Sequence, residues 1–263
     1  MEEIIVSPSN PRIKNVLKLK EKSSERRAQN LIVVEGAREI LMAIRNKFEI
    51  KTLFVCDIVN QKRHKELSTG LGHIVRVSKE VFDKIAYREN SDGLLALVKP
   101  KYPRFADLHL SENPLLVILE SVEKPGNLGA ILRTADGAGV DAVIVCDIKT
   151  DIYNPNVIRS SIGCVFSKQV VAATSEDVFK FLSEKNIKPY SAALAAKKMY
   201  SDVEFKIPCA IVMGTEADGL SQQWLKGGEP IKIPMLGKTD SLNVSASCAV
   251  IVYEAVRQRG PSK

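Results

Sequence analysis

The stretch that decides the fold is PLLVILESVEKPGNLGAILRTADGAGV, residues 114–140. Its first nine residues are almost continuously apolar, as expected for a strand that is covered on both faces of a parallel sheet. Pro125-Gly126 then turns the chain, and Asn127 is a suitable N-cap for a following helix. The apolar residues of that helix recur at helical spacing and form one buried stripe: Leu128, Ile131, Leu132 and Ala135. Strand, turn and helix in this order predict one unit of an α/β fold.

The same alternation continues to the end of the chain. Five further apolar runs are typical of buried strands: DAVIVCD (141–147), SKQVVAA (167–173), KPYSAAL (188–194), CAIVMG (209–214) and EPIKIPM (229–235). Helical patterns lie between them, as in NVIRSSIGCVF (156–166) and EDVFKFLSEKN (176–186). The last segment, 241–260, predicts a long helix capped by Ser241. This pattern indicates a doubly wound α/β domain with a parallel sheet.

Residues before the deciding stretch predict a second, smaller α/β unit. The first 30 residues form a basic arm with a helical pattern, which either lies along RNA or packs on its own domain. Strands are expected at 31–36, 51–57, 73–78 and 93–100, and helices at 37–47, 61–68 and 79–87. Proline and charge gather at 99–104, which predicts a linker. We therefore expect two domains, 1–105 and 106–263.

Charge is divided unevenly between these two parts. Residues 1–105 hold 21 Lys and Arg against 13 Asp and Glu, whereas residues 106–263 hold 17 against 18. The basic excess of the chain, +7, therefore belongs to the N-terminal part. This division favours an N-terminal domain that attracts a polyanion through its phosphates, although a solvated basic surface explains the charge equally well.

Several classes of function are disfavoured by what the sequence lacks. The five cysteines are scattered with no CxxC pair, which favours reduced thiols over disulfides or structural zinc. No histidine follows His109, so a Ser-His-Asp triad, a Cys-His pair and an HExxH zinc site are excluded from the C-terminal part. The GxGxxG fingerprint is missing, which counts against a nicotinamide-dependent dehydrogenase. No apolar run reaches the roughly 20 residues that cross a bilayer, and the N-terminus does not resemble a secretory signal, so we expect a cytoplasmic protein.

Three segments of the C-terminal part carry polar residues where ligands bind in α/β sheets. Arg133 and Asp136 lie off the buried stripe of the first helix, whose N-terminus is suited to an anion. Glu216 and Asp218 follow a strand between Gly214 and Gly219, at the carboxyl edge of the sheet. Asn243 and Ser245 lie at the start of the last helix, after the loop 234–240. Each segment alone is also compatible with an ordinary turn or helix start.

Taken together, the order and wording of these three segments closely resemble the signature motifs of the SpoU branch of the SPOUT methyltransferases. The resemblance spans about residues 114–259, and residues 1–105 resemble the small substrate-binding domain often joined to this catalytic domain. It implies a C-terminal domain with a deep trefoil knot, an exception to the rule that chains do not knot. It also implies methyl transfer from S-adenosylmethionine to a ribose 2′-hydroxyl of RNA, without a metal. Many relatives carry asparagine where this chain has Lys124.

The resemblance also implies roles for individual residues. Arg133 would be the leading catalytic residue, and four further residues would surround the ribose and its phosphate: Asn127, Glu216, Asn243 and Ser245. The cofactor pocket would be lined by Met213, Gly214, Ile233, Met235 and Leu242. The family works as a homodimer, so the Arg133 of one subunit would complete the site of the other.

The nature of the RNA is less constrained than the reaction. Ribosomal RNA is the expected substrate, with transfer RNA as an alternative, and a catalytically silent RNA-binding or ribosome-assembly factor would be an answer of a different class. For the grip on RNA phosphates we expect five cations of the N-terminal domain: Arg12, Lys14, Arg26, Arg27 and Arg38. Because a ribose must leave its stack to reach the pocket, single-stranded loops are the favoured targets.

Overall fold

The computed structural model describes residues 4–56, 73–87 and 91–260, which form two compact units. The first unit comprises Met1–Lys101 together with Asp151–Ser167, and the second comprises Tyr102–Thr150 together with Lys168–Lys263. The division after Lys101 falls within the linker expected at 99–104. Assignment of Asp151–Ser167 to the first unit was not expected, because this segment lies between two strands of the second unit in the sequence.

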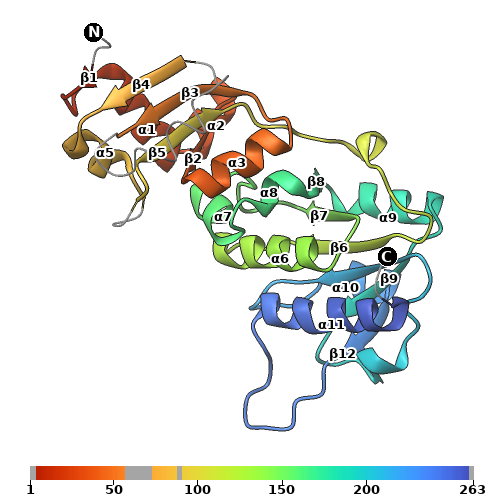
Figure 1. The fold of residues 1–263 in the computed structure, drawn as a ribbon. Helices are drawn as coiled ribbons and strands as arrows, with labels where there is room; N and C mark the ends of the chain where they lie inside the picture. The colour runs from red at the N-terminus through yellow and green to blue at the C-terminus, as the bar shows by residue number, and fades with distance from the viewer. Residues whose placement is uncertain (1–3, 57–72, 88–90, 261–263) are drawn as a thin grey trace. The chain divides into compact units, whose positions relative to one another are not determined.

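The first unit is built on a mixed five-stranded sheet with the strand order β1-β4-β3-β5-β2 (Figure 1). Strand β5 runs antiparallel to both of its neighbours, and the other pairs are parallel. The strands are β1 (Ile4–Ile5), β2 (Ile32–Glu35), β3 (Ile50–Val55), β4 (His73–Val77) and β5 (Leu94–Val98). The helices are α1 (Pro11–Glu21), α2 (Ser23–Gln29), α3 (Ala37–Arg45), α5 (Lys79–Ile85), α7 (Pro155–Ser160) and α8 (Cys164–Ser167). The helix expected at 61–68 lies outside the described residues.

The basic N-terminal segment packs on its own domain. Ile13, Val16 and Leu19 recur at helical spacing on α1, and all three are fully buried in the core of the first unit. Burial of such side chains contributes roughly 1.5–3 kcal/mol each, so α1 is an integral part of this unit. The apolar face of this segment therefore packs on its own domain, and its charged residues Arg12 and Lys14 lie on the exposed face.

The second unit contains a seven-stranded sheet in which every neighbouring pair is parallel, in the order β10-β12-β9-β11-β6-β7-β8. The strands are β6 (Leu115–Glu120), β7 (Ala142–Cys146), β8 (Gln169–Ala173), β9 (Lys188–Ala192), β10 (Lys198–Met199), β11 (Cys209–Met213) and β12 (Glu229–Lys232). The helices are α6 (Pro125–Gly137), α9 (Ser175–Glu184), α10 (Gln222–Gly227) and α11 (Val244–Arg259), with short 3-10 turns η1 (Phe105–Asp107) and η2 (Tyr200–Asp202). The expected α/β fold with a parallel sheet is confirmed.

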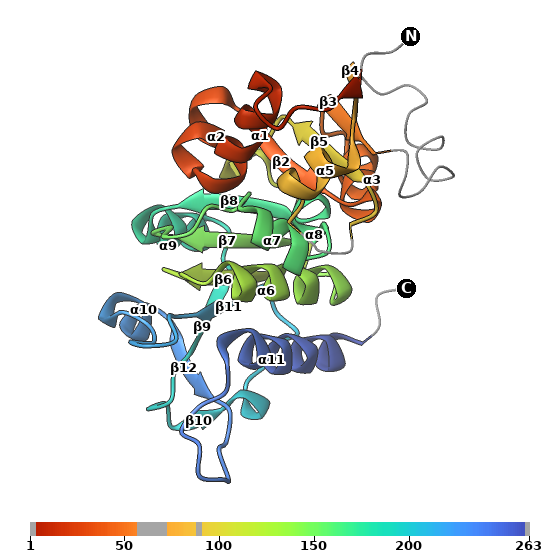
Figure 2. The same cartoon turned by 90° about the vertical axis from the view of Figure 1, so that its left-hand side faces the viewer.

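Helices cover both faces of this sheet, which explains the continuous apolar runs of its strands (Figure 2). On one face, side chains of α9 and α10 pack on β6, β7 and β11. On the other face, α6 and α11 contact each other and the sheet. Every residue of β6, β7 and β11 is buried as a result.

The strand order places a ligand crevice beside β6. The chain passes from β6 outward to β7 and β8, and then crosses to build β9, β11 and β12 on the other side. In open parallel sheets, ligands bind at the carboxyl edge where the order reverses in this way. The turns that follow β6, β11 and β12 are the three segments with the unusual polar residues.

Two expected helix caps are wrong by a few residues. Helix α6 begins at Pro125 with Lys124 as its N-cap, so Asn127 lies inside the first turn. Helix α11 is capped by Asn243, whose side chain accepts from the Ser245 N–H, and not by Ser241. The helix expected at 156–166 is divided into α7 and α8 by Ile162 and Gly163, which both adopt positive φ. Among the described residues, no helix is long and apolar enough to cross a membrane.

Candidate active site

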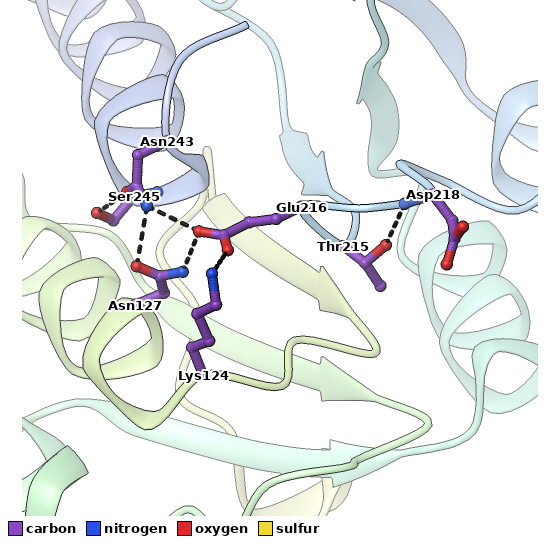
Figure 3. A network of polar contacts seen from close by, with 7 residues as sticks. All are labelled: Lys124, Asn127, Thr215, Glu216, Asp218, Asn243 and Ser245. Atoms are coloured by element: carbon purple, nitrogen blue, oxygen red, sulfur yellow. Dashed lines mark hydrogen bonds and ion pairs between the residues drawn. The ribbon is translucent and has the colours of Figure 1, made fainter.

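A carboxylate in the turn after β11 joins the three polar segments (Figure 3). The Glu216 Oε1 atom accepts from the Asn127 Nδ2 group at 2.5 Å and from the Asn243 Nδ2 group at 2.8 Å. Asn243 Nδ2 also lies 3.2 Å from Asn127 Oδ1. Residues 127, 216 and 243 are therefore in mutual contact, although they are 89 and 27 positions apart along the chain.

The start of α11 positions the amide of Asn243. Its Oδ1 atom accepts from the Ser245 backbone N–H at 2.9 Å and from the Ser245 hydroxyl at 2.6 Å. The cap thus satisfies a helix N–H group that would otherwise have no intrahelical partner. It also directs the amide nitrogen of Asn243 at Glu216. The sequence placed Ser245 at the site, and the structure shows it in contact with Asn243.

Lys124 forms an ion pair with the other oxygen of the same carboxylate, Glu216 Oε2. The hydrogen bond from Lys124 and that from Asn127 lower the pKa of Glu216, in that order. Glu216 is therefore ionised over a wider pH range than an ordinary glutamate. The Lys124 side chain is 70% exposed and that of Glu216 is 28% exposed, so the pair lies at the protein surface.

Glycines shape the turn that carries Glu216. Gly214 is buried, and a side chain there would collide with the Gly219 carbonyl and the Leu220 nitrogen. The Thr215 N–H donates to the Gly219 carbonyl at 2.9 Å, and Gly219 adopts a φ of +69°. The turn itself thus approaches the Gly214 backbone closely, and Gly219 adopts the left-handed conformation that the turn requires. Glu120, the last residue of β6, secures the far end of the turn by accepting from the Ser221 N–H at 2.8 Å.

A cavity of about 590 Å³ opens beside these residues. All five residues expected to line a cofactor pocket line this cavity: Met213, Gly214, Ile233, Met235 and Leu242. Glu216 and Asn243 also belong to its wall. Its volume is within the range of about 300–1,000 Å³ found for small-molecule sites.

Other lining residues were missed by the sequence analysis. The segment 192–195 follows β9 and forms part of the wall, as do Ser241, Ser247 and Ile251. The segment 192–195 could have been found by the rule applied to the other strands, because β9 also ends at the carboxyl edge of the sheet. Ser247 and Ile251 lie one turn apart on α11, and their position depends on how that helix packs.

Arg133 lies on α6 away from this network. Its side chain is exposed, and it is not among the residues that line the cavity. Within the described part of the chain, no hydrogen bond or ion pair of Arg133 is found. A single chain therefore brings together Asn127, Glu216, Asn243 and Ser245, but it does not bring Arg133 to them.

The five cations expected to grip RNA differ in exposure. Arg12, Lys14, Arg27 and Arg38 are exposed on the first unit. Arg26 is only 2% exposed, and its Nε group donates to Asp151 Oδ2 at 2.7 Å while Nη1 donates to the Leu19 carbonyl. A buried and paired guanidinium is unavailable to a phosphate, so the assignment of Arg26 is corrected to a structural one.

The amides, the carboxylate and the ammonium group of the site can act on a ligand through hydrogen bonds and charge. All five cysteines are buried free thiols, and burial raises the pKa of Cys146 and of Cys248 to about 12. Within the described ranges, no cluster of three His, Cys, Asp or Glu side chains is arranged to hold a metal ion. The site can orient a hydroxyl-bearing ligand next to the cavity through its amides and carboxylate.

Comparison with protein families gives two matches along the chain. Residues 114–253 match the SpoU rRNA Methylase family, and residues 10–96 match the MRM3-like substrate binding domain. The first match includes Lys124 and Asn127 as well as the segments that carry Glu216 and Asn243.

Individual relatives align over most of this chain. The chain is 28% identical over 255 residues to the 23S rRNA (guanosine(2553)-2'-O)-methyltransferase RlmP of Bacillus subtilis, covering 95% of this chain and 97% of that one. It is 38% identical over 197 residues to the 23S rRNA (guanosine-2'-O-)-methyltransferase RlmB of Pectobacterium atrosepticum, covering 72% of this chain and 81% of that one. The SpoU methyltransferase AviRb from Streptomyces viridochromogenes, solved in complex with the cofactor AdoMet, superimposes with a TM-score of 0.89 at 26% identity. That alignment covers 95% of this chain and 98% of AviRb.

Proposed function

This chain belongs to the SpoU rRNA methylase family, and from that premise we propose that it methylates a ribose 2′-hydroxyl of ribosomal RNA. The methyl donor would be S-adenosylmethionine. Two relatives, which align over most of the chain, are named 23S rRNA 2'-O-methyltransferases, which favours ribosomal RNA over transfer RNA as the substrate. An AdoMet-bound structural relative supports the choice of donor.

One observation carries the proposal: the turns after β6, β11 and β12 meet beside one cavity. Asn127, Glu216 and Asn243 form its polar rim, at the edge of the sheet where a nucleotide can approach. A protein that only bound RNA would need neither a cavity of ligand size nor a hydrogen-bonded rim beside it. The geometry therefore favours an enzyme over a silent binding factor.

The residues of the cavity fit S-adenosylmethionine. When bound, this cofactor supplies a methyl group on a positively charged sulfonium sulfur. Met213, Leu242 and Ile251 are apolar residues of the cavity wall, and residues 214–219, 233 and 235 bring backbone N–H and carbonyl groups to the same wall. Apolar walls with a few convergent polar groups are typical of sites for ligands of this size.

Arg133 is the proposed cation for the reaction. Because a guanidinium group holds its proton very tightly, the side chain is a poor proton acceptor and acts as a fixed charge. We assign it the phosphate next to the target ribose and the negative charge that develops on the 2′-oxygen. The rate would come mainly from holding the reacting atoms in line.

We further propose a homodimer in which Arg133 completes the site of the other subunit. Arg133 does not reach the rim in its own chain, although it belongs to the same segment as Asn127. Helix α11 presents Val250 and Tyr253 with 37% and 51% exposure, and exposed apolar side chains of this size favour a protein contact. The proposed dimer would form through the second unit, whose C-terminal segment we expect to be knotted as in the family.

The protein would act in the cytoplasm. Five buried free thiols suit a reducing compartment, and the bacterial relatives are named for 23S rRNA, which is made there.

The basic surface of the first unit would hold the RNA through Arg12, Lys14, Arg27 and Arg38.

The test is to map ribose methylation in RNA from cells with and without this protein, at single-nucleotide resolution. We expect one 2′-O-methyl group in 23S rRNA to disappear with the protein. Purified protein and labelled S-adenosylmethionine should restore that group on the unmodified RNA. Loss of a tRNA modification alone would redirect the substrate, and no change in any RNA would contradict the proposal.

A further inference from the structure

Lys124 is an exposed cation that contacts Glu216 in the wall of the cavity. Its side chain leaves the turn between β6 and α6 and reaches Glu216 on the turn after β11 (Figure 3). An exposed lysine side chain loses conformational entropy when it is held in one place. The contact between Lys124 and Glu216 therefore costs conformational entropy, and a role for Lys124 at the cavity would explain why the contact forms.

The hydrogen bonds of Glu216 show what this contact does. One carboxylate oxygen accepts from the two amides of Asn127 and Asn243, and the other accepts only from Lys124 among the described residues. The amides come from α6 and α11, which pack on each other. Without Lys124 the second oxygen would lose this partner, and the carboxylate could rotate away from the amides.

The ion pair also affects the protonation of Glu216. A neighbouring ammonium group stabilises the ionised carboxylate, which makes it a weaker proton acceptor. An ionised Glu216 keeps both amide nitrogens pointing at itself and leaves the Asn127 carbonyl oxygen in contact with Asn243. This arrangement suits a group that orients its neighbours better than one that takes the ribose proton.

We propose that Lys124 is a positioning residue, which holds the Glu216 carboxylate in the orientation that aligns Asn127 and Asn243 for the RNA ribose. The inference rests on the proposed function for its substrate. It assigns Glu216 to orientation and leaves proton removal to phosphate or water.

Lys149 provides a matched control. It follows β7 at the same edge of the sheet, its side chain is 52% exposed, and it pairs with Glu123 at 2.8 Å. Neither Lys149 nor Glu123 lines the cavity. Replacing Lys149 thus removes the same charge and the same kind of ion pair without touching the rim.

The experiment is a double-mutant cycle of Lys124→Met and Glu216→Gln, with kcat/KM measured on an in vitro transcript of 23S rRNA. In the wild-type background we expect Lys124→Met to lower kcat/KM about fivefold, the strong end of the range for exposed ion pairs. In the Glu216→Gln background the same change should cost less than about twofold, because its target is gone. Lys124→Arg should restore most of the rate, and Lys149→Met should leave it within about twofold.

Equal losses in both backgrounds would overturn the inference, because Lys124 would then act on the RNA directly. So would a loss after Lys149→Met that matched the loss after Lys124→Met. If the wild-type protein transferred no methyl group at all, the proposed function would fail. The role of Lys124 in holding Glu216 would then be tested by a measurement on the protein without RNA.

The measurement on the protein alone is an NMR titration of the Glu216 side-chain carboxyl carbon, carried out without RNA. The pKa of Glu216 is lowered mainly by Lys124, so the ion pair exists above this lowered pKa and is lost as the pH falls through it. Removing Lys124 should raise the pKa toward the ordinary glutamate value, whereas Lys149→Met should leave it unchanged. Within the described part of the chain, the other hydrogen-bond partners of this carboxylate are the neutral amides of Asn127 and Asn243. An unchanged pKa after Lys124→Met would refute the contact in solution.

Discussion

Arg133 and Lys124 are cations of the same segment, and of the two only Lys124 has a hydrogen-bond or ion-pair partner among the described residues. The difference follows from their places on α6. Lys124 caps the helix at the carboxyl edge of the sheet, whereas Arg133 lies more than two turns further along an exposed face. At the scale of single residues, the segment thus holds one cation that is paired with Glu216 and one whose side chain is exposed on α6.

The shape of the Arg133 side chain should matter as well as its charge. Arg133→Lys keeps the positive charge but loses the planar fork that binds a phosphate through two hydrogen bonds. We expect the single-turnover rate of methyl transfer to fall at least about tenfold. Arg257→Lys, on the exposed face of α11, should leave the rate within about twofold. A near-normal rate for Arg133→Lys would contradict the clamp.

Gly214 should not tolerate even a methyl group. A side chain there would collide with the Gly219 carbonyl, so Gly214→Ala must displace the turn that carries Glu216. We expect a loss of about 1–3 kcal/mol in the free energy of unfolding, measured with urea, and weaker binding of S-adenosylmethionine by calorimetry. Gly237→Ala is the control, because a methyl group there meets no atom within 4 Å. Equal behaviour of the two variants would argue against the tight turn.

At the scale of elements, Arg259 binds the end of α11 to the segments that precede two strands of the sheet. Arg259 donates to the backbone carbonyls of Asn113, Pro114, Phe205 and Ile207, at 2.6–3.2 Å. These carbonyls precede β6 and β11, the two strands whose far ends form the active-site rim. The first residues of α11 supply Asn243 and Ser245, so anchoring its last turn helps to define the position of the whole helix.

Arg259→Met should therefore destabilise the protein more than the loss of a surface charge would. It removes hydrogen bonds from a charged donor to four carbonyls, and we expect the free energy of unfolding to fall by about 2 kcal/mol. Arg257→Met is a matched control on the same helix turn, because Arg257 is 72% exposed and pairs only with Glu254 among the described residues. Its effect should stay below about 0.5 kcal/mol. Urea midpoints that shift equally would contradict this account of α11.

At the scale of the whole molecule, the proposed shared site makes a quantitative prediction. Arg133→Ala should abolish activity alone, and so should Glu216→Ala, which, unlike Glu216→Gln, leaves no side-chain oxygen to hold the amides of the rim. If Arg133 acts in the other subunit, a mixed dimer has one site with both groups intact. Random mixing makes half of the dimers mixed, so an equimolar mixture should recover about one quarter of wild-type activity.

Co-expression of the two variants with different tags, followed by purification through both tags, would isolate the mixed dimers for this measurement. The isolated dimers should show about half of the wild-type activity, since one site in two is complete. If they stayed inactive, Arg133 would act within its own chain or not at all.

The basic surface of the first unit belongs to the same scale, because it would act on RNA from a different unit than the rim. Arg12→Ala with Lys14→Ala should weaken binding of the 23S rRNA transcript and flatten its dependence on salt by a slope of about 1.5. The rate of the bound complex should not change. Lys180→Ala with Lys185→Ala removes the same charge from the second unit and should leave the slope unchanged. A slope equal to that of the wild type after the first change would contradict the assignment.

The features that could be predicted from the sequence were those that depend on residues close together along the chain. Strands buried on both faces leave continuous apolar runs, so the parallel sheet of the second unit was predicted correctly, and only the two-residue β10 was missed. The residues of the cavity wall followed from a resemblance to known motifs. The N-caps at Lys124 and Asn243 were misplaced, because a cap depends on where a side chain finds its partner.

The sequence by itself determined the layers of the fold, the domain with the basic excess and the residue types of the rim. Only the tertiary structure decided that Arg26 is buried against Asp151, that Asp151–Ser167 joins the first unit, and that Lys124 pairs with Glu216. Arg26 and Asp151 are 125 positions apart in the sequence, and Lys124 and Glu216 are 92 positions apart. Periodicity records which face of an element is buried, whereas the partner across a turn is set by the packing of separate elements, and that information appears only when the chain is folded.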